Sequence, residues 1–424
     1  MQTTHHYQDF LAILKEELVP AMGCTEPIAL AFAAAKAREV LGDFPDHVIA
    51  KCSGNIIKNV KCVTIPNTDD LVGIEASVVM GIVAGDASKE MEVLSSATPK
   101  QLTKVKQLLS EDFCKVELLE SPLQLHIQLE VFKDDQQVML EIKHSHIHIT
   151  QIIKNGELLY SGEDSDDKYL GTFTDRSILS LKAIKTFADT VNLEDVAPLM
   201  DLQIAYNMAI AKEGLKGYYG LGIGKVILES YSRGIVTDIK AYTSAASEAR
   251  MSGCVLPVII NSGSGNQGLT SSIPVVVYAK EKGISKEKLY RALVFSNLLT
   301  IHQKTFIGRL SAFCGAVSAS CASGAAITYL ERGSMEQIQK TIVNTLANIS
   351  GIICDGAKAS CASKIASSLD AAMMAHYLAM QNKAYAPFTG IVQDGIEETI
   401  SCVGYIGKEG MKQTDLEILK IMIS

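Results

Sequence analysis

The segment Ile353-Cys354-Asp355-Gly356-Ala357-Lys358-Ala359-Ser360-Cys361-Ala362-Ser363 carries two thiols separated by six residues. On an unbroken helix, residues at this spacing share a face but stand roughly 10 Å apart, which is wide for two ligands of one small cluster. The Asp-Gly step favours a turn, because glycine tolerates conformations that other residues avoid. We therefore expect Cys354 on a loop and a helix from about residue 357, so that the two sulfurs converge.

Two further thiols bear on the same site. Cys314 lies forty positions before Cys354, and Cys24 lies near the N-terminus. Our hypothesis is that three of the four cysteines hold an iron–sulfur cluster and that the fourth does chemistry beside it. The alternative is that they are small core fillers, because free cysteines are among the most buried residue types. Spacing alone leaves both interpretations open.

Cys24 stands within residues 23–27, which read Gly-Cys-Thr-Glu-Pro, just before a predicted helix that extends to about Leu41. Thr25 is a good N-cap, and an acidic residue and a proline suit the first turn that follows. A thiol at a helix N-terminus has a lowered pKa and is enriched in thiolate. Cys24 is therefore a candidate base, although a cysteine beside a helix cap can also simply pack.

The composition is typical of a well-packed soluble globular protein. It has 424 residues, 47% of them hydrophobic and 20% charged, with a formal net charge of −8, which argues against a nucleic-acid partner. The longest apolar runs are too short to span a bilayer, and the polar N-terminus does not resemble a signal peptide. Ten cysteines without a signal indicate a reducing cytoplasm, where metal binding or catalysis is commoner than disulfides.

The patterning predicts an α+β protein, with a mainly α-helical catalytic domain and a smaller α/β domain inserted near the N-terminus. We expect N-terminal helices over 1–44 that carry Cys24 and pack on the catalytic domain, a small α/β domain over 45–160, and a mainly α-helical cluster-binding domain over 161–424. Residues 46–65 read as strand, loop and strand. Further strand-like runs are 114–119, 123–132, 137–142, 147–153, 253–260 and 273–278.

Two polar segments are candidates for binding a substrate. The first contains Ser53, Asn55, Lys58 and Asn59, which can wrap a small anion but are also ordinary turn residues. The second, residues 261–268, reads Asn-Ser-Gly-Ser-Gly-Asn-Gln-Gly and lacks the spacing of phosphate-binding loops.

We expect a tight polar turn in the second segment that holds a carboxylate through Ser262, Ser264 and Asn266. Lys58, Lys304 and Arg309 are the candidate charge partners of that carboxylate.

Three histidines, His144, His146 and His148, alternate along a predicted strand and would share one face of it. Same-face neighbours on a strand are about 6.6 Å apart, so three of them rarely reach one zinc ion. We expect instead a partly exposed sheet face, or a single histidine that reaches a substrate.

Taken together, five motifs resemble the iron–sulfur L-cysteine desulfidases, relatives of the iron–sulfur L-serine dehydratase α-chain, and the UPF0597 group. The resemblance spans nearly the whole chain. The motifs are Gly23-Cys24-Thr25-Glu26-Pro27, Ser53-Gly54-Asn55 with Lys58-Asn59, Ala249-Arg250-Met251-Ser252-Gly253 with the 261–268 loop, Ile307 to Gly315, and Cys354-Asp355-Gly356-Ala357-Lys358 with Cys361-Ala362.

The resemblance implies a [4Fe–4S] cluster with three cysteine ligands and one open iron. By position these ligands are Cys314, Cys354 and Cys361, and Cys24 matches the family's N-terminal thiol, which is assigned as a base. Cys321 competes for the first ligand position, but Cys314 has the Phe-Cys-Gly context that resembles the family's.

The function that the resemblance implies is L-cysteine desulfidase, which converts L-cysteine and water to hydrogen sulfide, ammonia and pyruvate. L-Serine dehydration by the same residues is the alternative substrate chemistry, and a non-catalytic iron–sulfur sensor is the alternative class. A structural zinc protein and a pyridoxal-phosphate eliminase are further rivals, although no lysine stands in a recognisable Schiff-base context. The partners expected are a small amino acid, no nucleic acid and no membrane, and the small-residue helices are compatible with a homo-oligomer.

Overall fold

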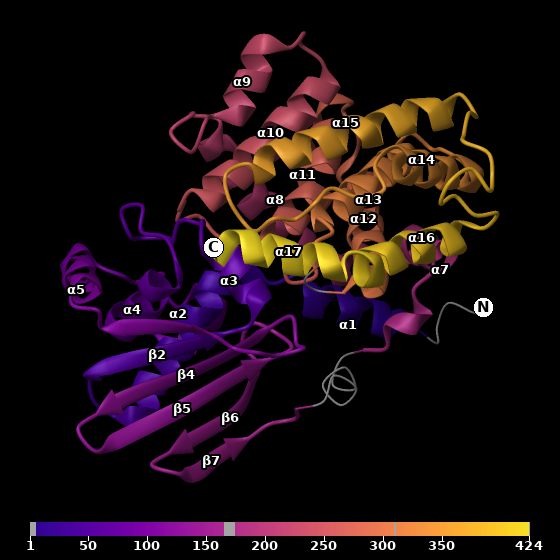
Figure 1. Cartoon of the computed structure of the whole chain (residues 1–424). Coiled ribbons are helices and arrows are strands. Elements are labelled where there is room, and N and C mark those ends of the chain that lie inside the picture. The colour runs from indigo at the N-terminus through magenta and orange to yellow at the C-terminus, as the bar shows by residue number, and fades with distance from the viewer. Residues whose placement is uncertain (1–5, 165–173, 309–310, 424) are drawn as a thin grey trace.

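The computed structural model describes residues 6–164, 174–308 and 311–423. Figure 1 shows a twisted sheet in the lower part of the molecule and a bundle of helices above it. The prediction of a mainly helical α+β protein is confirmed. No helix in the described ranges is long and apolar enough to cross a membrane.

The main sheet has six strands in the order β3-β2-β4-β5-β6-β7. β2 and β3 are parallel, and the other neighbours are antiparallel. Helices α2 and α4 pack on one face of the sheet, and α5 packs on α4. The bounds are α2 (Thr25–Leu41), β2 (His47–Cys52), α4 (Ile74–Ala84), the 3-10 helix η1 (Ala87–Glu92), α5 (Pro99–Ser110), β3 (Cys114–Leu118), β4 (His126–Lys133), β5 (Gln136–Lys143), β6 (Ile149–Lys154) and β7 (Glu157–Ser161).

The strands form because their side chains alternate between apolar and polar. In β4, Ile127, Leu129 and Val131 are fully buried, whereas the residues between them are partly exposed. The helix that covers them, α2, is rich in buried alanines and therefore approaches its neighbour closely. A Cβ atom on Gly81 of α4 would lie 2.2 Å from the main-chain oxygen of Ala31, so only glycine fits there.

The helical part is built around α13, which packs against α11, α12, α14 and α15 (Figure 1). All four neighbours bury it, and its small residues let them approach. The bounds of this part are α1 (Tyr7–Glu17), η2 (Arg176–Ile178), α7 (Leu181–Thr190), α8 (Leu193–Gly214), α9 (Ile223–Ser230), α10 (Ile235–Met251), α11 (Gly265–Glu281), α12 (Lys286–Ile307), α13 (Gly315–Leu330), α14 (Met335–Asn348), α15 (Cys361–Met380), α16 (Ile396–Tyr405), the π-helical turn η3 (Ile406–Gly410) and α17 (Lys412–Ile423).

The N-terminal segment is shared between the two parts. Helix α1 packs on α8 and α12, whereas α2 packs on the sheet. Between these helices, β1 (Pro20–Ala21) pairs with β8 (Val258–Ile259) of the helical part. A short helix, α3 (Gly54–Val60), follows β2 and packs against α17. The chain thus crosses between the two parts immediately before Cys24.

Three local predictions are wrong. The apolar run 273–278 is part of helix α11, because that helix is buried on nearly all sides and is therefore apolar without a period. The second strand expected within 46–65 is instead α3 and a loop. Residues 144–148 form a turn, and the strand begins only at Ile149, so the three histidines do not share a strand face.

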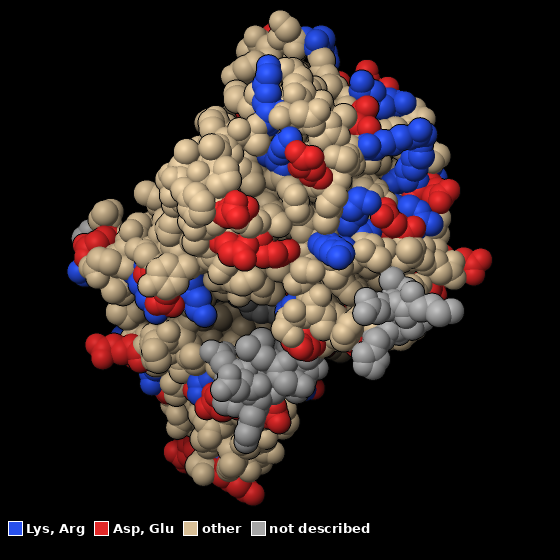
Figure 2. Space-filling view, turned by 90° about the vertical axis from the view of Figure 1, so that its right-hand side faces the viewer, with Lys and Arg blue, Asp and Glu red and all other residues tan. Residues whose placement is uncertain are grey.

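Figure 2 shows one face of the molecule, turned by 90° from Figure 1. On the described residues of this face, acidic and basic side chains are interspersed among uncharged ones. No continuous basic strip of the kind that binds nucleic acid is visible there.

Candidate functional site

All four cysteines singled out from the sequence line one cavity, at the junction of the sheet unit and the helical part. The sheet unit supplies residues from the start of α2, the end of α3 and the β5–β6 turn. The helical part supplies the rest. The lining residues include Cys24, Thr25, Glu26, Asn59, His146, Arg250, Ser262, Ser264, Asn266, Gln267, Lys304, Cys314, Cys354, Gly356 and Cys361.

Cys314 and Cys354 are held on two short extended segments that pair with each other. Phe313 and Ile353 form an antiparallel bridge. The Cys314 N–H donates to the Ile352 oxygen at 2.9 Å, and the Cys354 N–H donates to the Ala312 oxygen at 2.6 Å. Because side chains alternate along such segments, the two cysteines project to the same side of the pair as diagonal neighbours.

Cys361 is the first residue of α15, after the loop 354–360, which we call the cysteine loop. The helix starts a few residues later than the sequence predicts, and the loop is correspondingly longer. Gly356 has a φ of +97°, and a Cβ atom there would lie 2.3 Å from the main-chain oxygen of Lys58. Only glycine allows the cysteine loop to press on α3 in this way.

Ion pairs close the cysteine loop. Asp355 forms ion pairs with Lys358, at 2.7 Å, and with Lys364. Burial by itself raises the pKa of Asp355, but hydrogen bonds from the two lysines outweigh it and hold the pKa at about 2. Lys364 also donates to the main-chain oxygen of Ile353 at 2.8 Å, which ties the start of α15 back to the segment that carries Cys354.

The three thiols act on one another electrostatically. Burial, together with the negative charges of Cys354 and Cys361, raises the pKa of Cys314 to about 12. Burial is also the main reason that the pKa of Cys361 is raised. Three thiolates therefore cannot coexist here without a positive partner, so this donor set fits an iron–sulfur cluster.

Within the described residues, no group of three or more His, Cys, Asp or Glu side chains is arranged around a single metal ion. That finding does not conflict with a cluster. Each cysteine of a four-iron cluster binds a different iron, so its sulfurs stand farther apart than the ligands of one ion. Cys321, the competing ligand, is buried within α13 and its Sγ contacts the main-chain oxygen of Ile342 at 4.0 Å, away from the cavity lining.

Cys24 precedes the first residue of α2 and is buried. Its Sγ donates a hydrogen bond to Oε2 of Glu26 at 3.1 Å. The same carboxylate accepts bonds from Thr25 Oγ1 at 3.0 Å and from Asn59 Nδ2 at 3.3 Å. Glu26 is thus the centre of a buried network that joins α2 to α3.

The prediction that the helix N-terminus lowers the pKa of Cys24 is wrong. Burial and the negative charge of Glu26 raise this pKa well above its usual value, and the positive charge of Arg250 only partly opposes them. The sequence showed the helix start, but it did not show that a carboxylate two residues on would turn back onto the thiol.

The N-termini of several helices open onto the cavity. Cys24 and Cys314 are the residues just before α2 and α13, Ser264 is the residue before α11, and Cys361 begins α15. Helix N-termini carry partial positive charge and free N–H groups, which favour bound anions. The site is therefore suited to hold negative charge.

The predicted substrate-binding residues divide into two groups. Asn59, Ser262, Ser264, Asn266 and Lys304 line the cavity.

The cavity lining does not include Ser53, Asn55 or Lys58. Ser53 donates to the main-chain oxygen of Gln124 at 3.1 Å, and the fully buried Lys58 forms an ion pair with Asp415 of α17. Because this segment is a helix held by α17, only its end at Asn59 reaches the site. Arg309 lies outside the described residues.

Sequence reasoning missed two charged residues of the cavity, Glu26 and Arg250. Arg250, near the end of α10, is 2% exposed. Its Nη1 donates to Oδ1 of Asn266 at 3.2 Å, while its Nε and the Oε1 atom of Gln267 are buried without a hydrogen-bond partner. Both residues stand in motifs that carried the family resemblance, but neither position showed a role by itself.

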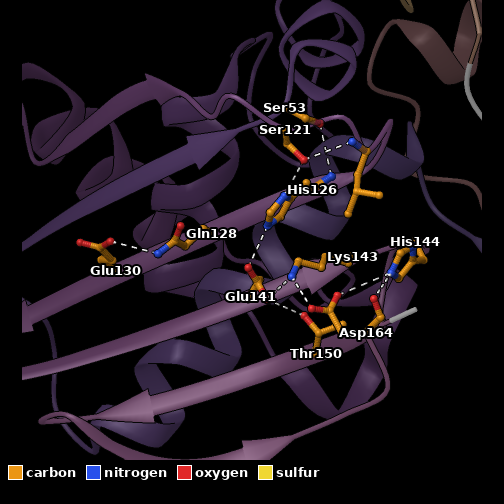
Figure 3. A network of polar contacts seen from close by, with 11 residues as sticks. Ser53, Ser121, His126, Gln128, Glu130, Glu141, Lys143, His144, Thr150 and Asp164 are labelled. Atoms are coloured by element: carbon orange, nitrogen blue, oxygen red, sulfur yellow. Dashed lines mark hydrogen bonds and ion pairs between the residues drawn. The ribbon is translucent and has the colours of Figure 1, made fainter. Parts of the chain in front are cut away.

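The buried His146 lines the cavity, as expected if a single histidine reaches a substrate. Figure 3 shows what anchors the turn that carries it. Glu141 accepts hydrogen bonds from Thr150 Oγ1 at 2.9 Å and from Lys143 at 2.9 Å, on the two sides of the turn, and contacts His126 Nε2 at 2.9 Å. Burial raises the pKa of Glu141, but these three bonds outweigh it and hold the pKa at about 2.

Comparison with known proteins identifies the family of this chain. Residues 88–420 match the family model described as the serine dehydratase alpha chain, which defines the class of protein. A UPF0597 protein of Desulfitobacterium hafniense is 51% identical over 99% of this chain and 97% of its own length. UPF0597 proteins of Lachnoclostridium phytofermentans (49% identical, 99% of this chain, 100% of theirs) and Treponema denticola (47%, 98% of each) are also similar.

The chain belongs to the serine dehydratase alpha-chain family and, within it, to the UPF0597 proteins. The resemblance of the motifs to the serine dehydratase α-chain and to the UPF0597 group is therefore confirmed.

Proposed function

We propose that this protein is a lyase that breaks the Cβ–S bond of L-cysteine and yields hydrogen sulfide, ammonia and pyruvate. L-Serine, with a C–O bond in the same place, is the alternative substrate. The observation that carries the proposal is that four cysteines remote in sequence, Cys24, Cys314, Cys354 and Cys361, line one cavity. Membership of a serine dehydratase-like family supports a lyase over the sensor alternative.

In this proposal Cys314, Cys354 and Cys361 hold a [4Fe–4S] cluster. When bound, such a cluster with one iron free of protein ligands supplies a Lewis acid for the leaving sulfur or oxygen of the substrate. Lys364 contributes a positive charge beside Cys314 and Cys361, and the cysteine loop closed by Asp355 keeps the spacing of Cys354 and Cys361.

Cys24 is assigned the role of general base that removes the Cα proton. Its hydrogen bond to Glu26 at 3.1 Å provides an acceptor for the thiol proton, so that the sulfur can take the substrate's proton in turn. The electrons of the Cα–H bond form the Cα–Cβ double bond while HS⁻ leaves from Cβ. The aminoacrylate product tautomerises to an imine, and water hydrolyses it to pyruvate and ammonia.

A reducing, cytoplasmic environment suits this assignment. All ten cysteines lie in the described ranges, and each is free. The three ligands proposed for the cluster and the base would be lost to disulfides under oxidising conditions.

Anaerobic reconstitution tests the proposal. Protein purified without oxygen and loaded with iron and sulfide is assayed for pyruvate from L-cysteine and from L-serine, with sulfide release measured for the former. We expect turnover of both substrates and a higher kcat/KM for L-cysteine. A higher value for L-serine overturns the choice of substrate, and loaded protein that releases no pyruvate from either favours the sensor. An aldimine absorbance band in the pure protein would favour the pyridoxal-phosphate rival.

A further inference from the structure

Two buried side chains of opposite charge line the cavity, and neither has a charged partner among the residues that the structure describes. Arg250 and Glu26 are 2% and 7% exposed. Among the described residues, Arg250 has no carboxylate within ion-pair distance and makes one hydrogen bond, to the neutral Asn266. Within the described ranges Glu26 likewise has no cationic partner, and its bonds come from Cys24, Thr25 and Asn59.

An arrangement of this kind is costly in an empty cavity. Buried charges are normally paired, because removing an ion from water is unfavourable unless a counter-charge compensates it. Arg250 and Glu26 do not compensate each other, since the two are not within ion-pair distance. Each therefore retains capacity for a partner of opposite charge that enters from the cavity.

Both side chains still have unused hydrogen-bonding positions. The Nε atom of Arg250 is buried without an acceptor, and a guanidinium binds a carboxylate through two parallel N–H groups. The Glu26 carboxylate can accept about four hydrogen bonds, of which three are present. Its Oε1 atom, bonded only to Asn59, is the one with room for a further donor.

Cys24 lies within the electrostatic reach of both groups: Glu26 bonds its thiol, and the charge of Arg250 also acts on it. A ligand whose negative and positive ends bind these two residues would have its central carbon near that sulfur. In an α-amino acid the central carbon is Cα, which carries the proton that the proposed reaction removes.

We propose that Arg250 and Glu26 form a receptor for the zwitterion of an α-amino acid, with the carboxylate on Arg250 and the ammonium group on Glu26. The choice of an amino acid as ligand rests on the proposed function. The receptor selects amino acids over hydroxy acids and over amines, and it works independently of the leaving group.

Binding to the cluster-free protein tests this inference without catalysis. L-Alanine carries both charges and no leaving group, L-lactate lacks the ammonium group, and L-alaninamide lacks the carboxylate. Isothermal titration with each ligand measures two preferences, one for the ammonium group and one for the carboxylate. We expect the wild-type protein to bind L-alanine at least about tenfold more tightly than either analogue, the effect of losing one charged hydrogen bond.

Substituting Glu26 or Arg250 should remove the preference for one charged group of the ligand and keep the preference for the other. Glu26→Gln is expected to bind L-alanine and L-lactate about equally while still discriminating against L-alaninamide. Arg250→Gln is expected to lose the discrimination against L-alaninamide only. This crossed pattern also shows that each variant is folded, because a collapsed cavity would lose both preferences.

Matched controls neutralise a buried and a part-buried charge elsewhere. Lys240→Gln, on the same helix as Arg250 but paired with Asp370 at 2.8 Å, and Glu130→Gln, paired with Lys51 at 2.6 Å on the sheet, should keep both preferences. If Lys304→Gln rather than Arg250→Gln removes the carboxylate preference, or if wild-type protein prefers neither charge, the inference is overturned.

These outcomes are distinct from failure of the lyase proposal. Reconstituted protein that makes no pyruvate, but shows the crossed binding pattern, would keep the amino-acid receptor and lose the reaction. Conversely, pyruvate formation with no crossed pattern would keep the reaction and remove this receptor.

Discussion

The hydrogen bond from Cys24 to Glu26 sets the chemistry of the cavity at the scale of single residues. A thiol 3.1 Å from a carboxylate, with its pKa raised by burial and by that carboxylate, stays protonated until the neighbouring oxygen accepts its proton. Cys24 is therefore suited to move a proton, whereas the three other thiols have each other as neighbours and are suited to hold metal.

Replacing Cys24 with alanine separates these two roles. We expect the reconstituted Cys24→Ala protein to keep its brown colour and its iron and sulfide content, while kcat falls by at least about two orders of magnitude. The matched variant Cys354→Ala should lose iron and colour as well as activity. If Cys24→Ala loses iron to the same extent, Cys24 is a ligand and the assignment of a base fails.

At the scale of elements, the cysteine loop and α3 depend on each other. Gly356 presses on the main chain of Lys58, while Asn59 from the same helix bonds Glu26. Helix α3 is also held by α17, where the buried Lys58 pairs with Asp415. The C-terminal helix thus supports the cavity without touching it.

Gly356→Ala should destabilise the cysteine loop. A left-handed conformation costs an L-residue about 1 to 2 kcal/mol, and the contact with the Lys58 oxygen adds to that cost. We expect a lower melting temperature and less bound iron after reconstitution. Gly283→Ala is the control, since Gly283 also has a positive φ, +62°, but open space around its Cβ position. Equal losses in both variants would mean that the close contact is unimportant.

Asp415→Asn should weaken the attachment of α17. The substitution leaves Lys58 buried without its counter-charge, which costs about 3 kcal/mol. Urea unfolding of the cluster-free protein measures this loss. Lys420→Gln, which removes an exposed pair with Glu417 on the same helix, should change the unfolding free energy by less than about 0.5 kcal/mol. Similar effects of both would contradict a structural role for the buried pair.

At the scale of the whole molecule, acid should destabilise the fold through a buried histidine. Burial between α13, α14 and α15 lowers the pKa of His376 to about 4, and its Nδ1 atom lies 2.8 Å from Thr328 Oγ1. The unfolded chain binds the proton more readily, because the ordinary pKa of histidine is about 6.5. The stability that depends on neutral His376 is therefore complete above about pH 6.5 and is lost as the pH falls towards 4.

We expect this histidine to contribute about 3 kcal/mol to the difference in unfolding free energy between pH 7.5 and pH 4. Urea titrations of cluster-free protein at several pH values measure it, and His376→Gln should flatten the dependence. If the unfolding free energy of His376→Gln depends on pH as strongly as that of the wild-type protein, other groups govern the acid response.

The helices and the sheet follow from local patterns, and most could be predicted from the sequence. The alternation in β4 and the breaks at Gly42 and before Cys361 are visible as residue types along the chain. The prediction failed for residues 273–278, where complete burial within α11 removes any period, and for Lys58, whose partner Asp415 is more than three hundred positions away. Local patterns carry no information about such distant partners.

The sequence by itself determined the family, the α+β class and the four cysteines worth examining, because motifs and periodicity are properties of neighbouring residues. Only the tertiary structure decided that these cysteines line one cavity, that Glu26 turns onto Cys24, and that Arg250 lies in the same cavity with no charged partner in the described part of the chain. Proximity and burial arise when distant segments pack together, and they determine which charges are compensated and how strongly a thiol holds its proton.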